Sequence, residues 1–340
     1  MKKRATIKDV ANEAQVSPAT ISYVLNNKES ISAETKERVL EAIKRLNYVP
    51  NLSARSLAAN TSKLIGVLIP QTEDSSMLMF NNPFYSEIIG GIEYGARVNG
   101  YHVLISGTNA DESYLRLAKE RNLDGIIIIG MYPDDFFNEL KKTQIPIVLI
   151  DSYCSDHYFH SVQINDRYGA YIATKYLLDK GHRSVALIAG EVKKNGVVEK
   201  RYLGYCDALK EYSIPVRSQL VFEGQVDFKS GMAQGEKLAK SPLKPTAAFA
   251  VADIMAIGAI KRLLQMGVKV PDDVSIIGFD DINLSKYINP GLTTVRQDIN
   301  KKGEMAIKLI LNSINSQTGK QEIILPVEIV ERESVKALDE

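Results

Sequence analysis

The sequence predicts an α/β protein with an N-terminal helix-turn-helix domain, a hinge helix and a body of two doubly wound parallel-sheet lobes. Three observations predict this class. Residues 6–26 carry two short helical patterns joined by a three-residue turn. From residue 63, apolar runs of strand length alternate with amphipathic helical segments. That alternation breaks once, near residue 162, which indicates two sheets rather than one.

The first helix is predicted by its N-terminal signal. Thr6 and Asp9 have the Thr-x-x-acid spacing in which a hydroxyl and a carboxylate satisfy free helix amides. An inward stripe follows at helical spacing, formed by Val10, Ala11 and Ala14.

The second helix begins after Ser17, a candidate N-cap, with Pro18 where a missing amide costs nothing. Ile21, Val24 and Leu25 should face the first helix, which leaves an outward set of Pro18, Ala19, Thr20, Ser22 and Tyr23. A third helix should run from Ser32 to about Asn47 and bury Val39, Leu40, Ile43 and Leu46. This pattern favours a helix-turn-helix unit whose second helix lies in a DNA major groove. Any other small three-helix bundle is the alternative.

The domain boundaries follow from composition. We expect the helix-turn-helix domain at 1–50, a hinge helix or linker at 51–62 and the body at 63–340. Within the body, we expect an N-lobe at about 63–161 plus 293–320 and a C-lobe at about 162–292 plus 321–340. Residues 51–60 could form a helix, but ten residues are too few for a stable isolated one.

Several strands of the body end in a carboxylate. Asp151 follows PIVLI, Asp253 follows the AFAVA strand, and Asp280 ends IIGFD. In doubly wound sheets ligands bind at the carboxyl ends of the strands, so these side chains should converge on a cleft shared by the lobes. Three carboxylates suit a ligand with many hydroxyls. The alternative for each is a helix N-cap.

Charge is unevenly distributed along the 340 residues. The net charge is +1 overall, but residues 1–60 hold 10 Lys and Arg against 6 Asp and Glu, and the rest hold 32 against 35. A positive head on a slightly negative body is weak support for a nucleic-acid-binding end. There is no apolar N-terminal leader and no run of 18 apolar residues, so we expect a cytoplasmic protein without a membrane anchor.

Metal, cofactor and catalytic sites are not expected. Cys154, His157 and His160 have a metal-like spacing, but they lie in a short polar link with no fourth ligand nearby. The sequence has no P-loop, no dinucleotide glycine pattern and no G-x-S-x-G motif. The Gly-Gly pair at 90–91 falls inside a predicted helix and favours close helix packing.

The order of motifs resembles the LacI/GalR family of bacterial transcription regulators over essentially the whole chain. The helix-turn-helix is followed by the hinge ARSL, the strand LIGVLIP and then NPFYSEIIGGIE, DGIIIIG, GHRSVALIAG, RYLGYCDAL, PTAAFAVAD, IGFDD and PGLTTVRQD. The resemblance implies a periplasmic-binding-protein-like body. It also implies a repressor that binds a palindromic operator as a homodimer, or as a tetramer, and releases it when a small effector binds.

The resemblance assigns DNA-contacting positions. Pro18, Ala19 and Tyr23 match base-reading positions, with Ser17 and Thr20 beside them. Residues matching backbone-phosphate contacts are Thr6, Ser22, Asn26, Ser32, Thr35 and Tyr48. Leu57 matches a hinge leucine that wedges into the minor groove, flanked by Arg55 and Ala58. Tyr23 stands where many members carry an arginine that grips guanine with two hydrogen bonds, and a tyrosine hydroxyl cannot make that fork.

The resemblance also assigns effector contacts. Arg201 in the R-x-x-G-Y pattern matches an arginine that holds the effector, and Asp280 matches its acidic counterpart. The other matching positions are Phe84, Tyr85, Asn109, Asp151, Val226, Asp253 and Gln297. Val226 stands where an aromatic residue often stacks on the ligand. Residues 71–82 form an unusually long, partly apolar loop that could line the cleft, cover a dimer surface or fold as a buried Ω-loop.

The predicted function is therefore a DNA-binding repressor released by a sugar or sugar phosphate. A ligand that strengthens DNA binding as a corepressor, or a second role as an activator, would fit the same sequence. A transport-type sugar-binding protein would share the two-lobed fold but needs no DNA-reading head. A sugar-modifying enzyme would need a nucleophile or a cofactor loop.

Overall fold

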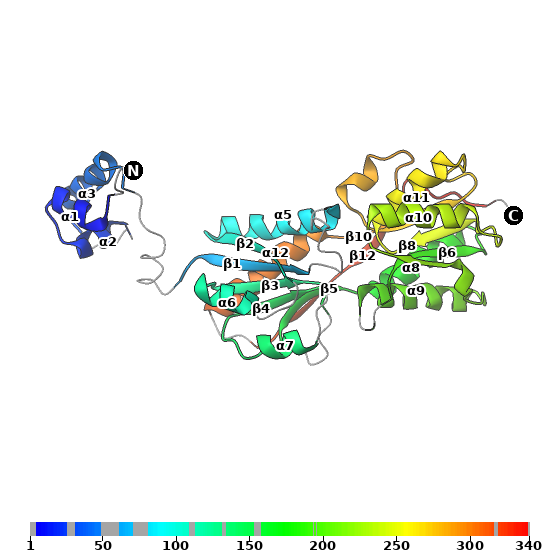
Figure 1. The fold of residues 1–340 in the computed structure, drawn as a ribbon, viewed down its shortest axis with the longest axis horizontal. Coiled ribbons are helices and arrows are strands. Elements are labelled where there is room, and N and C mark those ends of the chain that lie inside the picture. Colours follow the sequence, from blue (N-terminus) through cyan, green and yellow to red (C-terminus); the bar gives the residue numbers. More distant parts are fainter. Residues whose placement is uncertain are drawn as a thin grey trace. The chain divides into compact units, whose positions relative to one another are not determined.

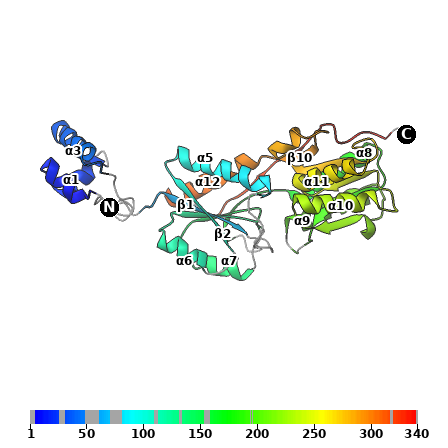
Figure 2. The ribbon, with the colours of Figure 1, turned by 45° about the horizontal axis from the view of Figure 1, so that its top comes forward.

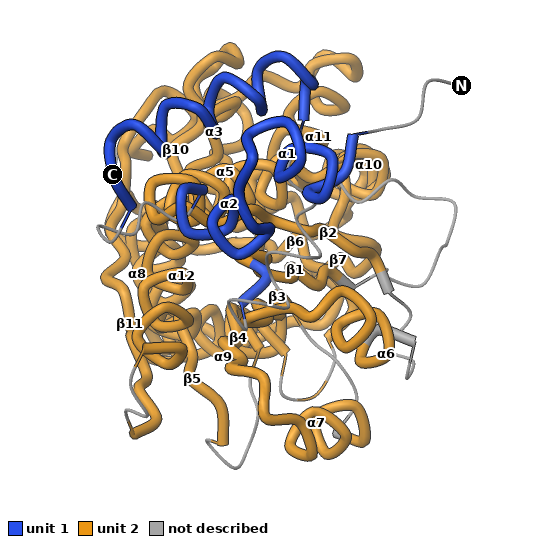
Figure 3. The backbone as a smooth tube through the Cα atoms, turned by 90° about the vertical axis from the view of Figure 1, so that its left-hand side faces the viewer, with its two compact units in different colours: residues 1–62 blue, residues 63–340 orange. Residues whose placement is uncertain are grey.

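The computed structural model describes residues 5–25, 31–48, 61–70, 81–108, 113–130, 134–152, 158–192, 194, 196–315 and 319–338. The chain divides into two compact units, residues 1–62 and residues 63–340 (Figure 3). Loop 71–82 is described only at residues 81 and 82. The predictions that this loop lines the cleft, covers a dimer surface or folds as a buried Ω-loop therefore fall on residues outside the described part of the chain.

Unit 1 contains three helices, α1 (Ile7–Ala14), α2 (Pro18–Leu25) and α3 (Ala33–Arg45). Their shared core contains Val10, Ala11, Ala14, Ile21, Val24, Val39 and Ala42. Leu40 was expected in this core, and that expectation is wrong, because its side chain is 50% exposed. Val39 and Ala42 take the inward face of α3, with Ile43 and Leu46 packed against the core. Leu40, the residue after Val39, therefore lies beside the buried stripe of α3 and not within it.

Unit 2 contains two six-stranded sheets (Figure 1). The N-lobe sheet has the order β11-β5-β4-β3-β1-β2 and the C-lobe sheet the order β12-β10-β9-β8-β6-β7. The N-lobe strands are β1 (Leu64–Pro70), β2 (His102–Thr108), β3 (Gly125–Ile129), β4 (Ile147–Ile150), β5 (His160–Ile164) and β11 (Glu322–Leu325). The C-lobe strands are β6 (Val185–Gly190), β7 (Val221–Gly224), β8 (Ala247–Ala250), β9 (Ser275–Asp280), β10 (Thr293–Gln297) and β12 (Val327–Val330).

Both sheets are parallel except at β12, which pairs antiparallel with β10. Each therefore has a doubly wound order with a switch point, between β1 and β3 in the N-lobe and between β6 and β8 in the C-lobe. The carboxyl ends of the strands beside these points are where this fold class presents side chains to a ligand.

The expected lobe boundaries differ from the sheets at three strands. β5 extends the N-lobe sheet beyond residue 161, β10 belongs to the C-lobe sheet, and β11 belongs to the N-lobe sheet. The chain passes between the lobes after each of them. Local apolar patterns identify a strand but not the sheet it joins, because that depends on pairing with strands far along the chain.

Helices cover both faces of each sheet (Figures 1 and 2). In the N-lobe, α5 and α12 lie on one face, and α6 and α7 on the other. In the C-lobe, α8 and α9 pack together, as do α10 and α11. The bounds are α5 (Pro83–Val98), α6 (Ser113–Glu120), α7 (Asp134–Leu140), α8 (Asp166–Asp179), α9 (Val197–Glu211), α10 (Phe228–Ala239), α11 (Asp253–Gln265) and α12 (Ile299–Asn315).

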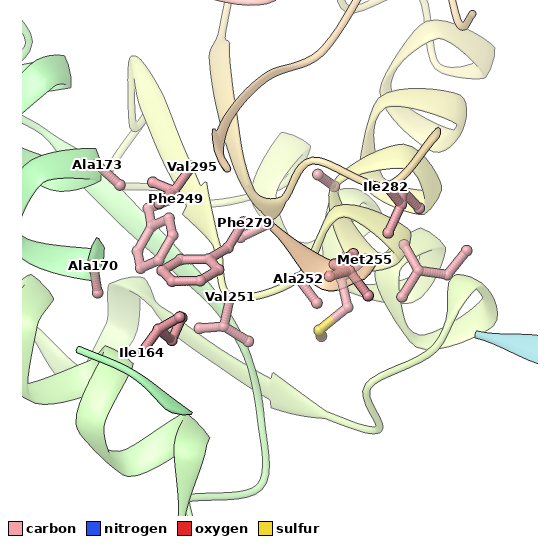
Figure 4. Close-up of a cluster of buried hydrophobic side chains, with 14 of the residues drawn as sticks. Ile164, Ala170, Ala173, Phe249, Val251, Ala252, Met255, Phe279, Ile282 and Val295 are labelled. Carbon is pink, nitrogen blue, oxygen red and sulfur yellow. The ribbon is translucent and has the colours of Figure 1, made fainter. Parts of the chain in front are cut away.

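The main hydrophobic core continues through both lobes. In the C-lobe, the rings of Phe249 and Phe279 lie 6.4 Å apart between the sheet and its helices (Figure 4). In the N-lobe, Gly91 lets α5 approach α12 closely, since a Cβ there would lie 2.2 Å from the Asn300 carbonyl oxygen. The Gly-Gly pair thus serves helix packing through Gly91, as the sequence indicated.

Candidate DNA-binding surface and effector site

The N-termini of the three helices in unit 1 carry side-chain caps. The Thr6 amide donates to Asp9 Oδ2 over 2.7 Å, and the Asp9 amide donates back to Thr6 Oγ1 over 3.3 Å. The Thr20 amide donates to Ser17 Oγ over 3.1 Å at the start of α2. Ser32 accepts from the Thr35 amide over 3.3 Å at the start of α3. Helix N-termini are natural sites for backbone phosphates, because their free amides and dipole favour negative charge.

The outward face of α2 matches the set expected from the sequence. Ser17, Pro18, Ala19 and Tyr23 are exposed, and Tyr23 retains 42% of its accessible surface. Thr20 and Ser22 are half-buried. Ile21 and Val24 are buried against α1 and α3, which fixes the rotation of α2 about its axis. The short polar side chains are thereby presented at the beginning of the helix.

The remaining predicted DNA contacts divide into two groups. Thr6 and Ser32 are exposed, whereas Thr35 and Tyr48 are half-buried, Tyr48 lying against the core of unit 1. The residues that lie outside the described part of the chain are Asn26, Arg55, Leu57 and Ala58.

In unit 2, six polar side chains form one connected group between the lobes. We call it the interlobe cluster, and its members are Asp151, Asp166, Arg201, Asp280, Gln297 and Lys302. Each of them is at least nine-tenths buried. They come from the carboxyl ends of β4, β9 and β10, from the first turns of α8 and α12, and from α9.

Arg201 is the centre of the C-lobe part of the cluster. Its Nε donates to Asp166 Oδ1 over 2.7 Å, and its Nη1 donates to the Val251 carbonyl over 2.5 Å and to Asp280 Oδ1 over 3.3 Å. The guanidinium lies 3.6 Å from the centroid of the Phe279 ring. A buried guanidinium needs this many partners, because an unpaired charge away from water is strongly unfavourable.

Gln297 and Lys302 carry the connection into the N-lobe. Gln297 Nε2 donates to Asp280 Oδ1 over 2.6 Å. The ammonium of Lys302 donates to Asp151 Oδ1 and Oδ2 over 2.7 and 2.8 Å, and also to Gln297 Oε1. Since Gln297 accepts from Lys302 and donates to Asp280, its amide can point only one way.

Sequence reasoning missed two members of the cluster. Lys302 lies in the inward stripe of α12 with Ile299, Ala306 and Ile310, so a lysine at an apolar position was the available signal. Asp166 follows Asn165, which caps α8 by accepting from the Tyr168 amide over 2.9 Å, so it looked like an ordinary first-turn acid.

Burial and the neighbouring carboxylates shift the proton equilibria of the site. Burial raises the pKa of Asp280 to about 6, against the opposing charge of Arg201. Burial also raises the pKa of Asp151, while Lys302 holds it down. The phenol of Tyr85 has its pKa raised to about 12 by burial and by the charges of Asp151 and Asp280. Perturbed groups of this kind gather at functional sites.

Two aromatic side chains lie beside the cluster. Phe84 and Tyr85 begin α5, where Asn82 accepts from the Phe84 amide over 3.0 Å, and their rings meet edge to face at 5.6 Å. Lys302 Nζ lies 5.9 Å from the Phe84 ring. Both predicted residues are therefore close to the polar group. Asn109 lies outside the described residues.

The structure places Asp253 in a different role from the one expected. Its carboxylate is fully buried and accepts from the Ile282 amide, Ser285 Oγ and Thr294 Oγ1 over 3.0, 2.6 and 2.6 Å. These bonds fasten the segment after β9 and the strand β10 to the start of α11. Three donors to one enclosed carboxylate indicate a structural residue, so the expectation that it faces a ligand does not hold.

Val226 lies at the carboxyl edge of the C-lobe sheet. It is 36% exposed, and a Cβ on Gly190 would meet Val226 Cγ2 at 2.5 Å and Val198 Cγ2 at 3.4 Å. This position is apolar and offers no ring for stacking.

No helix in the described part of the chain is long and apolar enough to span a membrane.

Comparisons with known proteins cover both units. Residues 6–51 match the family described as bacterial regulatory proteins, lacI family, and residues 174–335 match a periplasmic binding protein-like domain. The HTH-type transcriptional repressor PurR of Histophilus somni (strain 129Pt) is 36% identical, covering 98% of this chain and 100% of that protein.

Solved structures agree with these matches. The lac repressor dimer bound to operator and the anti-inducer ONPF is 28% identical with a TM-score of 0.87, covering 98% of this chain and all of that one. A LacI family regulator from Enterococcus faecium with bound ribose is 31% identical with a TM-score of 0.73, covering 81% of this chain and all of that one. This protein therefore belongs to the LacI family and is a DNA-binding transcriptional repressor of that family rather than an enzyme.

Proposed function

We propose that this repressor acts in the cytoplasm as a homodimer, each helix-turn-helix domain reading one half of a palindromic operator. A sugar or sugar phosphate bound between the lobes of unit 2 lowers operator affinity. The observation that carries this proposal is the interlobe cluster, because it joins the strand ends of both lobes beside Phe84 and Tyr85. A ligand that replaces or adds to those contacts changes how the two lobes sit against each other.

The coupling works only through a difference in affinity. If the effector binds one arrangement of the lobes more tightly, it shifts the population toward that arrangement. By linkage, operator DNA must then weaken effector binding by the same factor. Supporting the dimer, the lac repressor relative is described as a dimer bound to operator. Supporting the ligand class, the Enterococcus faecium relative holds ribose.

The DNA part of the proposal is tested by selection from a library of inverted repeats, followed by binding measurements on the selected sequence. Tyr23→Ala should weaken binding to that sequence about 2- to 13-fold, the range for one lost hydrogen bond of about 0.5–1.5 kcal/mol. Leu40→Ala is the matched control, since it also truncates an exposed side chain of unit 1 and should leave affinity unchanged. Failure to select any inverted repeat would refute the proposal.

The effector part is tested by asking which sugars and sugar phosphates release the selected operator. Arg201→Lys keeps the charge but loses the planar fork that binds Asp166 and Asp280 together. We expect it to fold and bind operator but to lose the effector response. Arg201→Ala would leave three buried carboxylates with one cation fewer, so a loss of folding there would say nothing about the ligand. A full response in Arg201→Lys would place the ligand elsewhere.

A further inference from the structure

One end of the N-lobe takes no part in the interlobe cluster. The strands β1 to β5 and β11 run parallel, so all six begin at the same end of the sheet. The cluster lies at the other end, where β4 leads into Asp151. The helices between these strands run back, so they finish where the strands begin, and the chain from unit 1 enters there at Lys63. We call this end the amino edge, and it consists of the described residues that begin a strand, form the last turn of a helix or lie between the two.

The amino edge has more cations than carboxylates among its described residues. The seven cations are Lys63, Arg97, Lys119, Arg121, Lys141, Lys142 and Lys320, and the four carboxylates are Glu120, Asp124, Glu139 and Glu322. Each of the four carboxylates has a hydrogen-bond or ion-pair partner, the pairs being Glu120 with Arg116, Glu139 with Lys142, Asp124 with the Lys63 amide and Glu322 with Gln163.

Four of the cations form no ion pair with any described residue, and all four are exposed: Lys63, Lys119, Arg121 and Lys320. The ammonium of Lys63 instead lies 4.2 Å from the centroid of the Tyr101 ring. That of Lys320 lies 5.0 Å from the centroid of the Tyr158 ring. These positive groups are therefore available to an anion from outside the chain.

Helix ends account for only part of this arrangement. Cations are stabilised near a helix C-terminus by the helix dipole, which would explain Lys119 and Arg121 at the end of α6. Lys63 stands directly before β1, and Lys320 stands two residues before β11 and five residues after the last residue of α12. The helix dipole does not explain cations at those two places, because its effect falls off within the last turn.

The four cations form a row across the end of the sheet. In the strand order of the N-lobe, β11 and β1 are four steps apart. At about 4.8 Å a step, the row from Lys320 to Lys63 is about 19 Å long. Lys119 and Arg121 precede β3, which is the neighbour of β1. Duplex DNA carries one negative charge per about 1.7 Å of its axis, so a stretch of this length offers about eleven phosphates.

We propose that the amino edge of the N-lobe binds the phosphate backbone of the duplex that flanks the operator. Unit 1 contains the DNA-binding helices, and the chain joins unit 1 to unit 2 at this edge. DNA held by unit 1 is therefore tethered to unit 2, and a tether raises the effective concentration at which weak phosphate contacts form. This contact adds sequence-independent affinity to the base contacts of α2, and it depends neither on the effector nor on the interlobe cluster.

The test compares two triple variants of the full chain. The first combines Lys119→Gln, Arg121→Gln and Lys320→Gln at the amino edge. Lys63 is left unchanged, because it adjoins the residues that link the two units. The control variant removes the same numbers of Lys and Arg from exposed positions of the C-lobe, and combines Arg217→Gln, Lys229→Gln and Lys237→Gln.

The probes are the selected operator at the centre of a short duplex of about 20 base pairs and of a long duplex of about 50 base pairs, titrated between about 50 and 200 mM salt. If the three side chains each bind one phosphate, the slope of log affinity against log salt on the long duplex should be smaller by about 2.7 in the amino-edge variant. The affinity difference between this variant and the wild type should then shrink about 40-fold over that salt range. On the short duplex the two proteins should bind equally, and the control variant should behave as the wild type on both.

Equal salt slopes for the wild type and the amino-edge variant on the long duplex would overturn the proposal, as would an equal loss in the control variant. A lower melting temperature of the amino-edge variant with unchanged DNA affinity would overturn it too, since the cations would then only offset the helix ends.

A mixed-sequence duplex of the longer length, without an operator, separates this inference from the proposed function. The amino-edge variant should bind it more weakly than the control variant, with a smaller salt slope. Failure to select any inverted repeat would refute the proposed function, and the mixed-sequence duplex would still decide whether the amino edge binds DNA. Selection of an operator together with equal binding of both variants to the mixed-sequence duplex would refute only the amino-edge contact.

Discussion

Lys302 offers the sharpest test of how the interlobe cluster is stabilised. Its side chain has no solvent exposure, and its ammonium makes both of the hydrogen bonds to the Asp151 carboxylate. Lys302→Met keeps much of the side-chain volume and removes only the charged group. It leaves a buried carboxylate unpaired, which typically costs about 3–5 kcal/mol. A loss of that size should lower the melting temperature by roughly 10 °C.

The stability lost in Lys302→Met should be larger at high pH than at low pH. Burial raises the pKa of Asp151 above its ordinary value, so the folded protein binds this proton more readily than the unfolded chain does. A group with a raised pKa stabilises the fold at pH values below its pKa in the unfolded chain. This stability is lost as the pH rises through the raised pKa of the folded protein. Lys302 opposes the shift at Asp151 and also at Asp280. Without Lys302 both pKa values rise further, so the destabilisation should be largest at pH 8 and smaller at pH 5.

The assay is urea unfolding of the full chain at pH 5, 6, 7 and 8, followed by circular dichroism. Asp151→Asn is the partner in a double-mutant cycle, because asparagine is neutral and tolerates the positive φ of 51° at this position. The double variant should be less destabilised than the sum of the single variants by about 0.5–3 kcal/mol. Equal losses for Lys302→Met at pH 5 and pH 8, together with an additive cycle, would refute this reasoning.

Two further predictions concern the framework. His160 Nδ1 accepts from the Gln321 amide over 3.1 Å, and burial lowers the pKa of His160. The stability that neutral His160 contributes is therefore present above pH 6.5, its ordinary pKa, and is lost as the pH falls below that value. His160→Asn should reduce this loss, measured as the difference between the urea midpoints at pH 7.5 and pH 5.5. A Cβ on Gly204 would lie 2.0 Å from the Arg167 carbonyl oxygen, so Gly204→Ala should destabilise by about 1–3 kcal/mol. Gly319→Ala, with open space around it, is the thermal-unfolding control. Equal melting temperatures for the two alanine variants would contradict the close packing of α8 and α9.

Local signals predicted the elements of this fold well. The capping pairs at Thr6 and Ser17 and the apolar runs of the strands are short-range features, and the structure has the helices and strands they indicate. Leu40 was misplaced because neighbouring residues of α3 satisfy the helical spacing almost equally well, and only packing against α1 and α2 decides between them. The sheet membership of β10 and β11 likewise depends on partners far along the chain.

The candidate site shows the same limit at the level of chemistry. Acidic residues at strand ends pointed to Asp151 and Asp280, and the structure brings both into one cluster. Their partners could not be read locally, because Lys302 is 151 residues from Asp151 in sequence, and Arg201 is 79 from Asp280.

Asp253 and Asp280 show why two acids at strand ends cannot be told apart from the sequence alone. Both follow an apolar strand, and both looked equally suited to a hydroxylated ligand. The Ser285 and Thr294 hydroxyls enclose the first, whereas the second keeps one oxygen without a partner in the described part of the chain. The number of carboxylates that a ligand meets, and the number of cations left to balance them, therefore depend on the tertiary contacts of each acid.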